Sequence, residues 1–130
     1  MVQGRPYYSK IDQICRSNGW VLGADQGELV IAVPQQDGSQ QSVIINDFQD
    51  PSGQAAIRIW SPVAPVAKVP IDQAMTVNFQ LPAGCLAVNP ANNQVVICAT
   101  RIINYTDQAE LSTVLSTVAH FASFYAKHYG

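Results

Sequence analysis

Three stretches of the chain carry apolar residues at the spacing of an amphipathic helix. The first covers residues 6–18, where Pro6 suits the first helical position and Asn18-Gly19 provides a stop. The last begins at Asp107, which forms a capping-box-like start with Glu110. Its apolar stripe consists of Leu111, Val114, Val118, Phe121, Ala122 and Tyr125. These patterns predict an N-terminal helix and a long C-terminal helix that closes over one face of a sheet.

A shorter helix is predicted over about residues 70–80. Its shared face consists of Ile71, Ala74, Met75, Asn78 and Phe79. The stretch Pro62 to Pro70, just before it, is punctuated by prolines and predicts a linker without continuous regular structure.

Short apolar runs separated by turn residues predict the strands. Four of them, at 20–24, 28–33, 42–48 and 54–61, are joined by turns at 25–27, 37–38 and 51–53. Short connections of this kind imply an antiparallel meander. A further hairpin, 85–89 with 94–102, turns through residues 90–93. The whole chain, residues 1–130, therefore reads as one α+β domain in which the three helices pack on an antiparallel sheet.

Alternation in the fourth run separates two sets of side chains. Ile57 and Ile59 point to one face, while Arg58 and Trp60 point to the other. If the isoleucines meet the core, Trp60 lies at least partly outside it. Trp and Arg are enriched at interface hot spots, which makes Arg58 and Trp60 candidate interface residues. The alternative, that a helix covers this face and Trp60 is core, stays open.

The two cysteines of the predicted hairpin face each other if its turn is centred between residues 91 and 92. Cys85 is then opposite Cys98, with Cβ atoms about 4.5–5.5 Å apart, which is close to disulfide range. The two are therefore a candidate redox pair. The alternative is a pair of reduced thiols packed as small apolar side chains. Three widely spaced cysteines without a CxxC pair or a histidine cluster predict no metal site.

Composition narrows the class of partner. Charged residues are 12% of the chain, about half the usual share of roughly 25%, and hydrophobic residues are 48%. So few charges favour self-association, and hence a homodimer. The net charge of −2, with scattered basic residues, argues against nucleic acid. No apolar run approaches the roughly 18 residues of a membrane span, and the N-terminus lacks a signal-peptide core. We expect a soluble cytoplasmic protein.

No constellation of residues predicts catalysis or a cofactor. His120 and His128 are the only histidines, and they lie eight residues apart on the last helix. The acidic residues fall mostly in turns and caps, where structure alone explains them. Asp47 and Asp50 flank Phe48 but lack the spacing of a calcium loop. The glycines form no phosphate-binding loop. We therefore expect a protein that is not an enzyme.

Several segments resemble the YbjN-like proteins and, more distantly, type III secretion chaperones. They are residues 11–15 with Gly19-Trp20, residues 27–31, 56–59 and 75–78, and the closing helix from Leu111 to Tyr125. The resemblance implies an α+β sandwich, commonly dimeric and without catalytic residues, that binds other proteins or has a regulatory role. This chain is less acidic than typical secretion chaperones.

Two functional hypotheses follow. The first is a homodimeric, non-catalytic module that binds another protein through apolar surface on the sheet or the short helix, with Arg58, Trp60 and Phe79 as candidate interface residues. The second is a small-molecule-binding protein or enzyme with a pocket between the sheet and the last helix. Polar groups converging around His120 or Asp47 would favour the second hypothesis.

Overall fold

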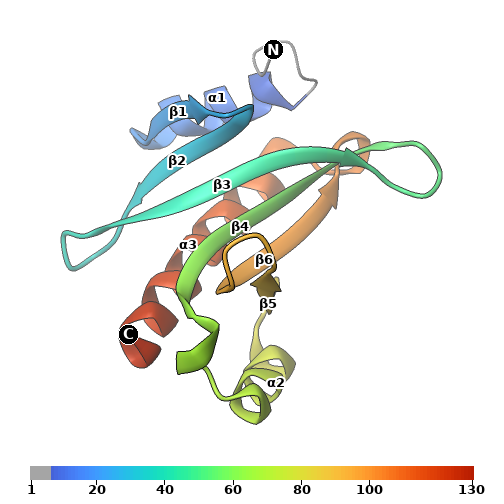
Figure 1. Cartoon of the computed structure of the whole chain (residues 1–130). Helices are drawn as coiled ribbons and strands as arrows, with labels where there is room; N and C mark the ends of the chain where they lie inside the picture. The colour runs from blue at the N-terminus through green and yellow to red at the C-terminus, as the bar shows by residue number, and fades with distance from the viewer. Residues whose placement is uncertain (1–6) are drawn as a thin grey trace.

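A computed structural model describes residues 7–130 and confirms the predicted α+β architecture (Figure 1). The described residues form three α-helices and six strands, with short 3₁₀ turns at Val66–Lys68 and Ile103–Tyr105. The helices are α1 Tyr8–Asn18, α2 Ile71–Gln80 and α3 Gln108–Tyr129. The strands are β1 Val21–Asp25, β2 Glu28–Pro34, β3 Gln40–Gln49, β4 Ala55–Pro65, β5 Cys85–Asn89 and β6 Gln94–Ile102.

All six strands form one antiparallel sheet in the order β1-β2-β3-β4-β6-β5. The first four follow one another as the predicted meander. The β5–β6 hairpin then adds to the free side of β4 through β6, so β5 is the second edge strand. The hairpin has the register predicted from its turn, with Cys85 opposite Cys98 and Asn89 opposite Gln94.

The core lies between one face of this sheet and helices α1 and α3, which are both behind the sheet in Figure 1. Inward-facing strand residues such as Ile31, Ile45 and Ile59 are fully buried against Leu115 of α3. The predicted start of α3 is confirmed, because the Asp107 carboxylate accepts a hydrogen bond of 2.7 Å from the backbone N–H of Glu110. Burial of a continuous apolar layer is what stabilises this arrangement.

Helix α1 ends as the sequence predicts. Gly19 adopts the left-handed conformation (φ +71°), and its N–H bonds to the carbonyl of Arg16 while the next N–H bonds to that of Cys15. The described helix begins at Tyr8, and Pro6, the predicted first helical residue, lies outside the described residues.

The prediction of an irregular linker from Pro62 to Pro70 is wrong for its first half. Strand β4 continues to Pro65, with a bulge between Pro62 and Ala64. The backbone ladder between β3 and β4 ends at Ile44 and Trp60, so Pro62 lies where β4 is paired with β6 alone. A proline without an N–H is tolerated on such an edge. The Gln41 side chain instead joins the strands there, donating to the carbonyl of Pro62 at 2.9 Å.

Candidate functional site

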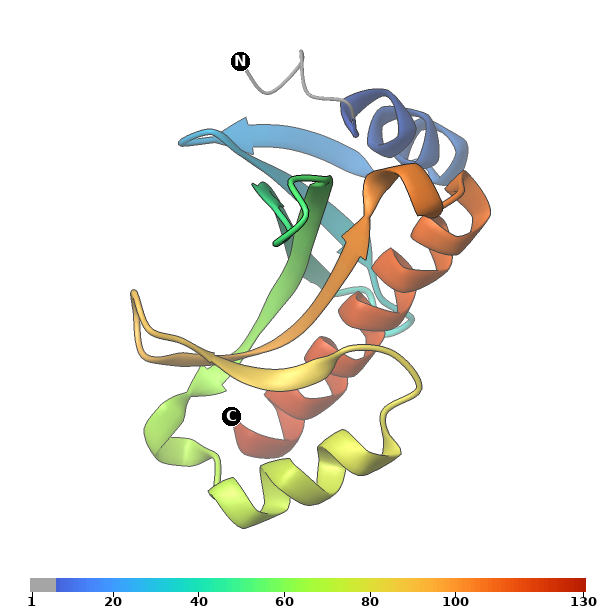
Figure 2. The same ribbon diagram turned by 90° about the vertical axis from the view of Figure 1, so that its right-hand side faces the viewer.

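One face of the sheet has no helix on it. Helices α1 and α3 both lie on the opposite face, as the side view shows (Figure 2). The uncovered face, which we call the open face, carries Arg58 and Trp60, as the alternation of strand β4 predicts. Arg58 is exposed and Trp60 is partly buried, whereas Ile57 and Ile59 on the other face are fully buried. No helix of the described residues therefore makes Trp60 a core residue.

A line of apolar side chains crosses the open face from edge to edge. Strand pairing places Val30 opposite Ile44, Ile44 opposite Trp60 and Trp60 opposite Cys98. Opposed residues of an antiparallel pair lie on the same face and in contact distance. The complete line, which we call the apolar row, is Gly23, Val30, Ile44, Trp60, Cys98 and Cys85.

A polar row lies directly beside the apolar one. Asn46 is opposite Arg58, and Arg58 is opposite Thr100. The amide of Asn46 donates to the Glu28 carboxylate at 3.2 Å, and the Arg58 guanidinium lies 4.5 Å from the centre of the Phe48 ring. The cation–π contact holds the guanidinium over the sheet. The open face therefore combines an apolar strip with one oriented cation.

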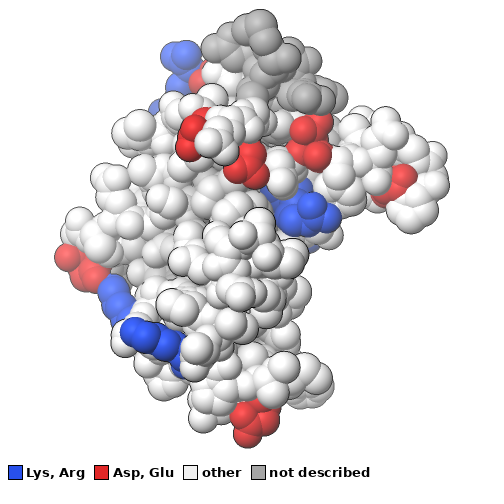
Figure 3. Space-filling model, in the orientation of Figure 1, with Lys and Arg blue, Asp and Glu red and all other residues white. Residues whose placement is uncertain are grey.

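The open face is hollowed between two hairpin turns. The hollow has a volume of about 630 Å³, and the β1–β2 and β5–β6 turns form its opposite rims. In Figure 2 both turns project from the sheet on the side away from α1 and α3. We call this space the open-face hollow and define it by its lining residues, which are Gln26, Glu28, Asn46, Arg58, Trp60, Ala87, Val88, Asn89, Pro90, Ala91, Asn92, Val96 and Cys98. Figure 3, in the orientation of Figure 1, shows that most of the surface on this side carries no charge.

Phe79, the third candidate interface residue, lies on a separate surface. It belongs to helix α2, where Ile71, Met75 and Phe79 form an exposed stripe with relative exposures of 81%, 69% and 93%. We call these three residues the α2 stripe. Helix α2 contributes no fully buried residue. Its Ala74 and Val77 pack against the core while partly exposed. The Asn78 side chain also joins it to β5, because it donates to the carbonyl of Leu86 at 3.2 Å and accepts from the N–H of Leu86 at 2.5 Å.

The structure brings the candidate redox pair to one end of the apolar row. Cys85 is exposed, Cys98 is half-buried, and both thiols are free. Burial raises the pKa of the Cys98 thiol, and the neighbouring Cys85 raises it further, while Arg58 acts in the opposite direction. The third cysteine, Cys15, is in the core, where burial raises its pKa to about 11.

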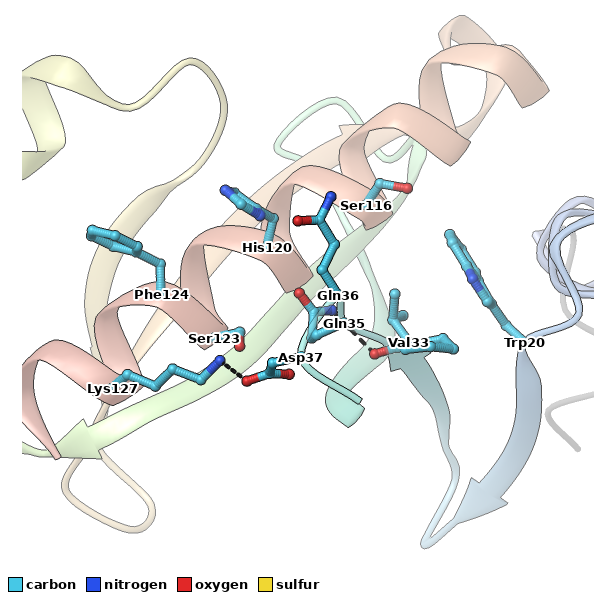
Figure 4. A pocket seen from close by; sticks show the side chains of 11 residues that line it. Trp20, Val33, Gln35, Gln36, Asp37, Ser116, His120, Ser123, Phe124 and Lys127 are labelled. Carbon is cyan, nitrogen blue, oxygen red and sulfur yellow. Dashed lines mark hydrogen bonds and ion pairs between the residues drawn. The ribbon is translucent and has the colours of Figure 1, made fainter. Parts of the chain in front are cut away.

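A second hollow, of about 460 Å³, lies between helix α3 and the β2–β3 turn (Figure 4). We call it the helix-side hollow. Polar side chains around His120 line it, and the Lys127 ammonium pairs with the Asp37 carboxylate at its edge. That hydrogen bond, with others from Ser39, holds the pKa of Asp37 well below its usual range. Trp20 and Phe124 supply apolar walls. Asp47, the other residue around which a polar pocket was expected, lines neither the open-face hollow nor the helix-side hollow.

The geometry around His120 does not assemble a catalytic group. His120 is exposed, and its ring contacts Phe121 edge-on at 5.0 Å. None of the hydrogen bonds between described residues involves its imidazole, whereas a catalytic base is ordinarily oriented by a third group. Among residues 7–130, no cluster of three or more histidines, cysteines or carboxylates is placed to bind a metal. None of the described helices is both long and apolar enough to span a membrane.

Sequence reasoning predicted that Trp60 and Arg58 share one face of the sheet but did not identify their neighbours across the strands. The turn at 51–53 places residues whose numbers sum to 104 opposite each other, and Ile44 with Trp60 satisfies that condition. Counting outward from the centre of the turn, as was done for Cys85 and Cys98, would have identified Ile44 as the neighbour of Trp60. Nothing in the sequence identifies Asn78 as the contact between α2 and β5.

Comparison with known proteins places the fold. No protein-family model matches the chain, and no curated protein matches its sequence. A chain of the solved "Structure of the HopA1-SchA Chaperone-Effector Complex" superposes with a TM-score of 0.66 at 10% sequence identity. The match covers 93% of this chain and 93% of that chain. The expected resemblance is therefore borne out in part, because this chain shares its fold with a chain of a chaperone-effector complex.

Proposed function

We propose that this chain is a non-catalytic module that binds an extended apolar segment of another protein in the open-face hollow. The observation that carries this proposal is the apolar row on a sheet face that α1 and α3 leave uncovered. Within the row, Val30, Trp60 and Cys98 are partly exposed, while Ile44 between them is buried. Contiguous apolar surface that reaches solvent marks interaction sites. A partly buried Trp60 at its centre supplies a large rigid contact of the kind that dominates interface energetics.

The polar row defines the chemistry of the segment. Of the described residues that line the hollow, only Arg58 and Glu28 are charged, and the Glu28 carboxylate already accepts a hydrogen bond from Asn46. The Arg58 guanidinium stacks on Phe48 and keeps hydrogen-bond donors for a partner. We therefore expect a segment with alternating apolar side chains and a carboxylate that pairs with Arg58. The likeness to a chain of a chaperone-effector complex supports a protein as the partner.

Two copies of the chain would associate through the α2 stripe. Helix α2 presents three large apolar side chains to solvent, and a twofold arrangement would pair two such stripes. Burying six side chains of this size contributes on the order of 10 kcal/mol, while association itself costs about 4–15 kcal/mol. We therefore propose a homodimer that dissociates on dilution.

The open-face proposal is tested with the two tryptophans as a matched pair. Trp60→Ala removes the centre of the apolar row, while Trp20→Ala removes a tryptophan from the helix-side hollow. The probe is a synthetic peptide with alternating leucine and aspartate, measured by calorimetry against an all-polar control peptide of the same length. We expect Trp60→Ala to weaken binding at least tenfold and Trp20→Ala to leave it within twofold. Equal weakening in both variants, or no binding to the wild-type chain, contradicts the proposal.

The dimer has its own test. Sedimentation of wild type and Phe79→Ser across a concentration series should show a dimer for the wild type and a monomer for the variant, with unchanged circular dichroism. Trp60→Ala is the control and should remain a dimer, since Trp60 lies outside the α2 stripe. A wild-type chain that stays monomeric at high concentration refutes the dimer but not the open-face site.

The helix-side hollow supports the second hypothesis, a small-molecule site. Polar groups converge around His120 there, and its volume of about 460 Å³ falls in the range of ligand pockets, about 300–1,000 Å³. A ligand screen by thermal shift on wild type, His120→Ala and Trp60→Ala distinguishes the two hypotheses. A compound whose shift is lost only in His120→Ala would favour the small-molecule function.

A further inference from the structure

Strands β5 and β6 hold two thiols face to face at the end of the apolar row. Cys85 and Cys98 are directly opposed in the antiparallel ladder. Opposed residues in such a ladder have Cα atoms about 4.5 or 5.5 Å apart, and both values lie within the roughly 4.4–6.8 Å that a disulfide spans. Their Cβ atoms need to approach by about 1 Å from the usual cross-strand separation.

Gly84 lets the chain come close to β6 just before Cys85. It adopts φ +78°, and a Cβ at this position would lie 2.9 Å from the carbonyl oxygen of Cys98. A side chain there would push β5 away from β6, so the glycine maintains the close approach of the two cysteines. The geometry of the pair is therefore fixed by both the ladder and the residue that precedes it.

We propose that Cys85 and Cys98 are a reversible redox site that closes to a cross-strand disulfide by exchange with a small-molecule disulfide such as oxidised glutathione. The Cys85 thiolate attacks one sulfur of the small disulfide and releases one small thiolate, which takes up the proton that Cys85 lost. The Cys98 sulfur then attacks the Cys85 sulfur and releases the second small thiol. Two protein thiols are oxidised and one small disulfide is reduced to two thiols.

The order of the two steps follows from exposure. Cys85 is exposed and open to a small disulfide, while Cys98 is half-buried in the wall of the open-face hollow. Burial also raises the pKa of Cys98, which keeps it protonated and makes it the poorer first nucleophile. An exposed disulfide is accessible to thiols, so the bond is reducible. This inference does not depend on the proposed function, because it concerns the thiols alone.

Trp60 reports on the bond, since it is the direct cross-strand neighbour of Cys98. A disulfide next to an indole quenches its fluorescence, so closure should dim Trp60. In a Trp20→Phe background, Trp60 is the only tryptophan left. A bond between Cys85 and Cys98 closes the hairpin into a loop and so restricts the unfolded chain. We therefore expect the melting temperature to rise by about 5–10 °C.

The experiment equilibrates the Trp20→Phe chain in glutathione buffers of increasing oxidised fraction and follows three readouts: intact mass with peptide mapping, fluorescence and melting temperature. We expect the loss of two hydrogen atoms, a bond mapped to Cys85 and Cys98, dimmer fluorescence and full reversal by reduced glutathione. Cys98→Ser should stop at a glutathione adduct on Cys85, and Cys85→Ser should show neither the bond nor the dimming.

Three results would overturn the proposal. The first is a stable glutathione adduct on Cys85 of the chain that retains Cys98. The second is a disulfide between two copies of the chain. The third is the persistence of both free thiols in fully oxidised buffer. None of these results bears on peptide binding in the open-face hollow under reducing conditions, so failure of the redox site and failure of the proposed function are distinguishable.

Discussion

Helix α2 packs on the core through partly buried side chains such as Ala74 and Val77, and a side-chain amide also attaches it to the edge of the sheet. The amide attachment can be removed by changing a few atoms. Asn78 uses one donor and one acceptor to occupy the backbone groups of Leu86 at the edge of β5. Asn78→Asp keeps the size of the side chain and the acceptor for the Leu86 N–H. It replaces the donor by an anionic oxygen that faces the Leu86 carbonyl.

The size of the effect follows from these two contacts. A typical hydrogen bond contributes about 0.5–1.5 kcal/mol, and leaving a buried polar group unpaired costs about 1–3 kcal/mol. Since the contact is only partly buried, we expect Asn78→Asp to make docking of α2 less favourable by about 2 kcal/mol. A protonated carboxyl donates again, so the difference between variant and wild type should shrink below about pH 4.

Hydrogen exchange at the Leu86 amide measures this directly. A loss of about 2 kcal/mol corresponds to roughly 30-fold faster exchange at neutral pH. Thr76→Ala is the matched control, because Thr76 bonds within α2 to the carbonyl of Asp72 and does not touch β5. If Asn78→Asp and Thr76→Ala change the exchange of Leu86 equally, or if the Asn78→Asp effect is independent of pH, the reasoning is refuted.

Three further substitutions test other features. Ser61 is fully buried with two hydrogen bonds to β3, so Ser61→Val should lower the free energy of unfolding by about 2 kcal/mol in urea titration; an unchanged midpoint would contradict this. Lys127 holds the pKa of Asp37 below its usual range, so the carboxylate stabilises the fold above about pH 4 and this contribution disappears as the pH falls. Asp37→Asn should therefore reduce the loss of unfolding free energy between neutral and acid pH. An unchanged loss would refute the pairing. Gly84→Ala adds a backbone clash with Cys98 to left-handed strain, whereas Gly38→Ala adds strain alone. The melting temperature should therefore fall more for Gly84→Ala. Equal falls would exclude the close approach of Gly84 to the backbone of Cys98.

Much of the fold could be predicted because local chemistry and global structure agree. The glycine after Asn18, the capping Asp107 and the turn-rich tetrapeptide at 90–93 each fix an end or a register. Alternation over residues 57–60 of β4 then determines which face Trp60 occupies. These signals act over a few residues, and a single sequence contains them.

The features that were missed depend on neighbours distant in the chain. A strand through Pro62 is allowed only because the ladder to β3 has already ended and the Gln41 side chain takes its place. The role of Asn78 depends on where the edge of β5 lies after folding. The open-face hollow lies between two turns, and its rim residues Gln26 and Asn92 are 66 positions apart in the sequence. None of these is determined by spacing or propensity in one segment.

The position of α3 at the end of the element order has a consequence for synthesis. Residues such as Leu115 and Val118 cover the apolar face of strands that are all made before them. At about 5–20 residues per second, the sheet leaves the ribosome with that face exposed until α3 follows. During this interval the nascent chain exposes the core-facing side of the sheet in addition to the open face, which alone stays uncovered in the finished protein. We therefore expect its yield in cells to depend on how well nascent chains are protected from aggregation.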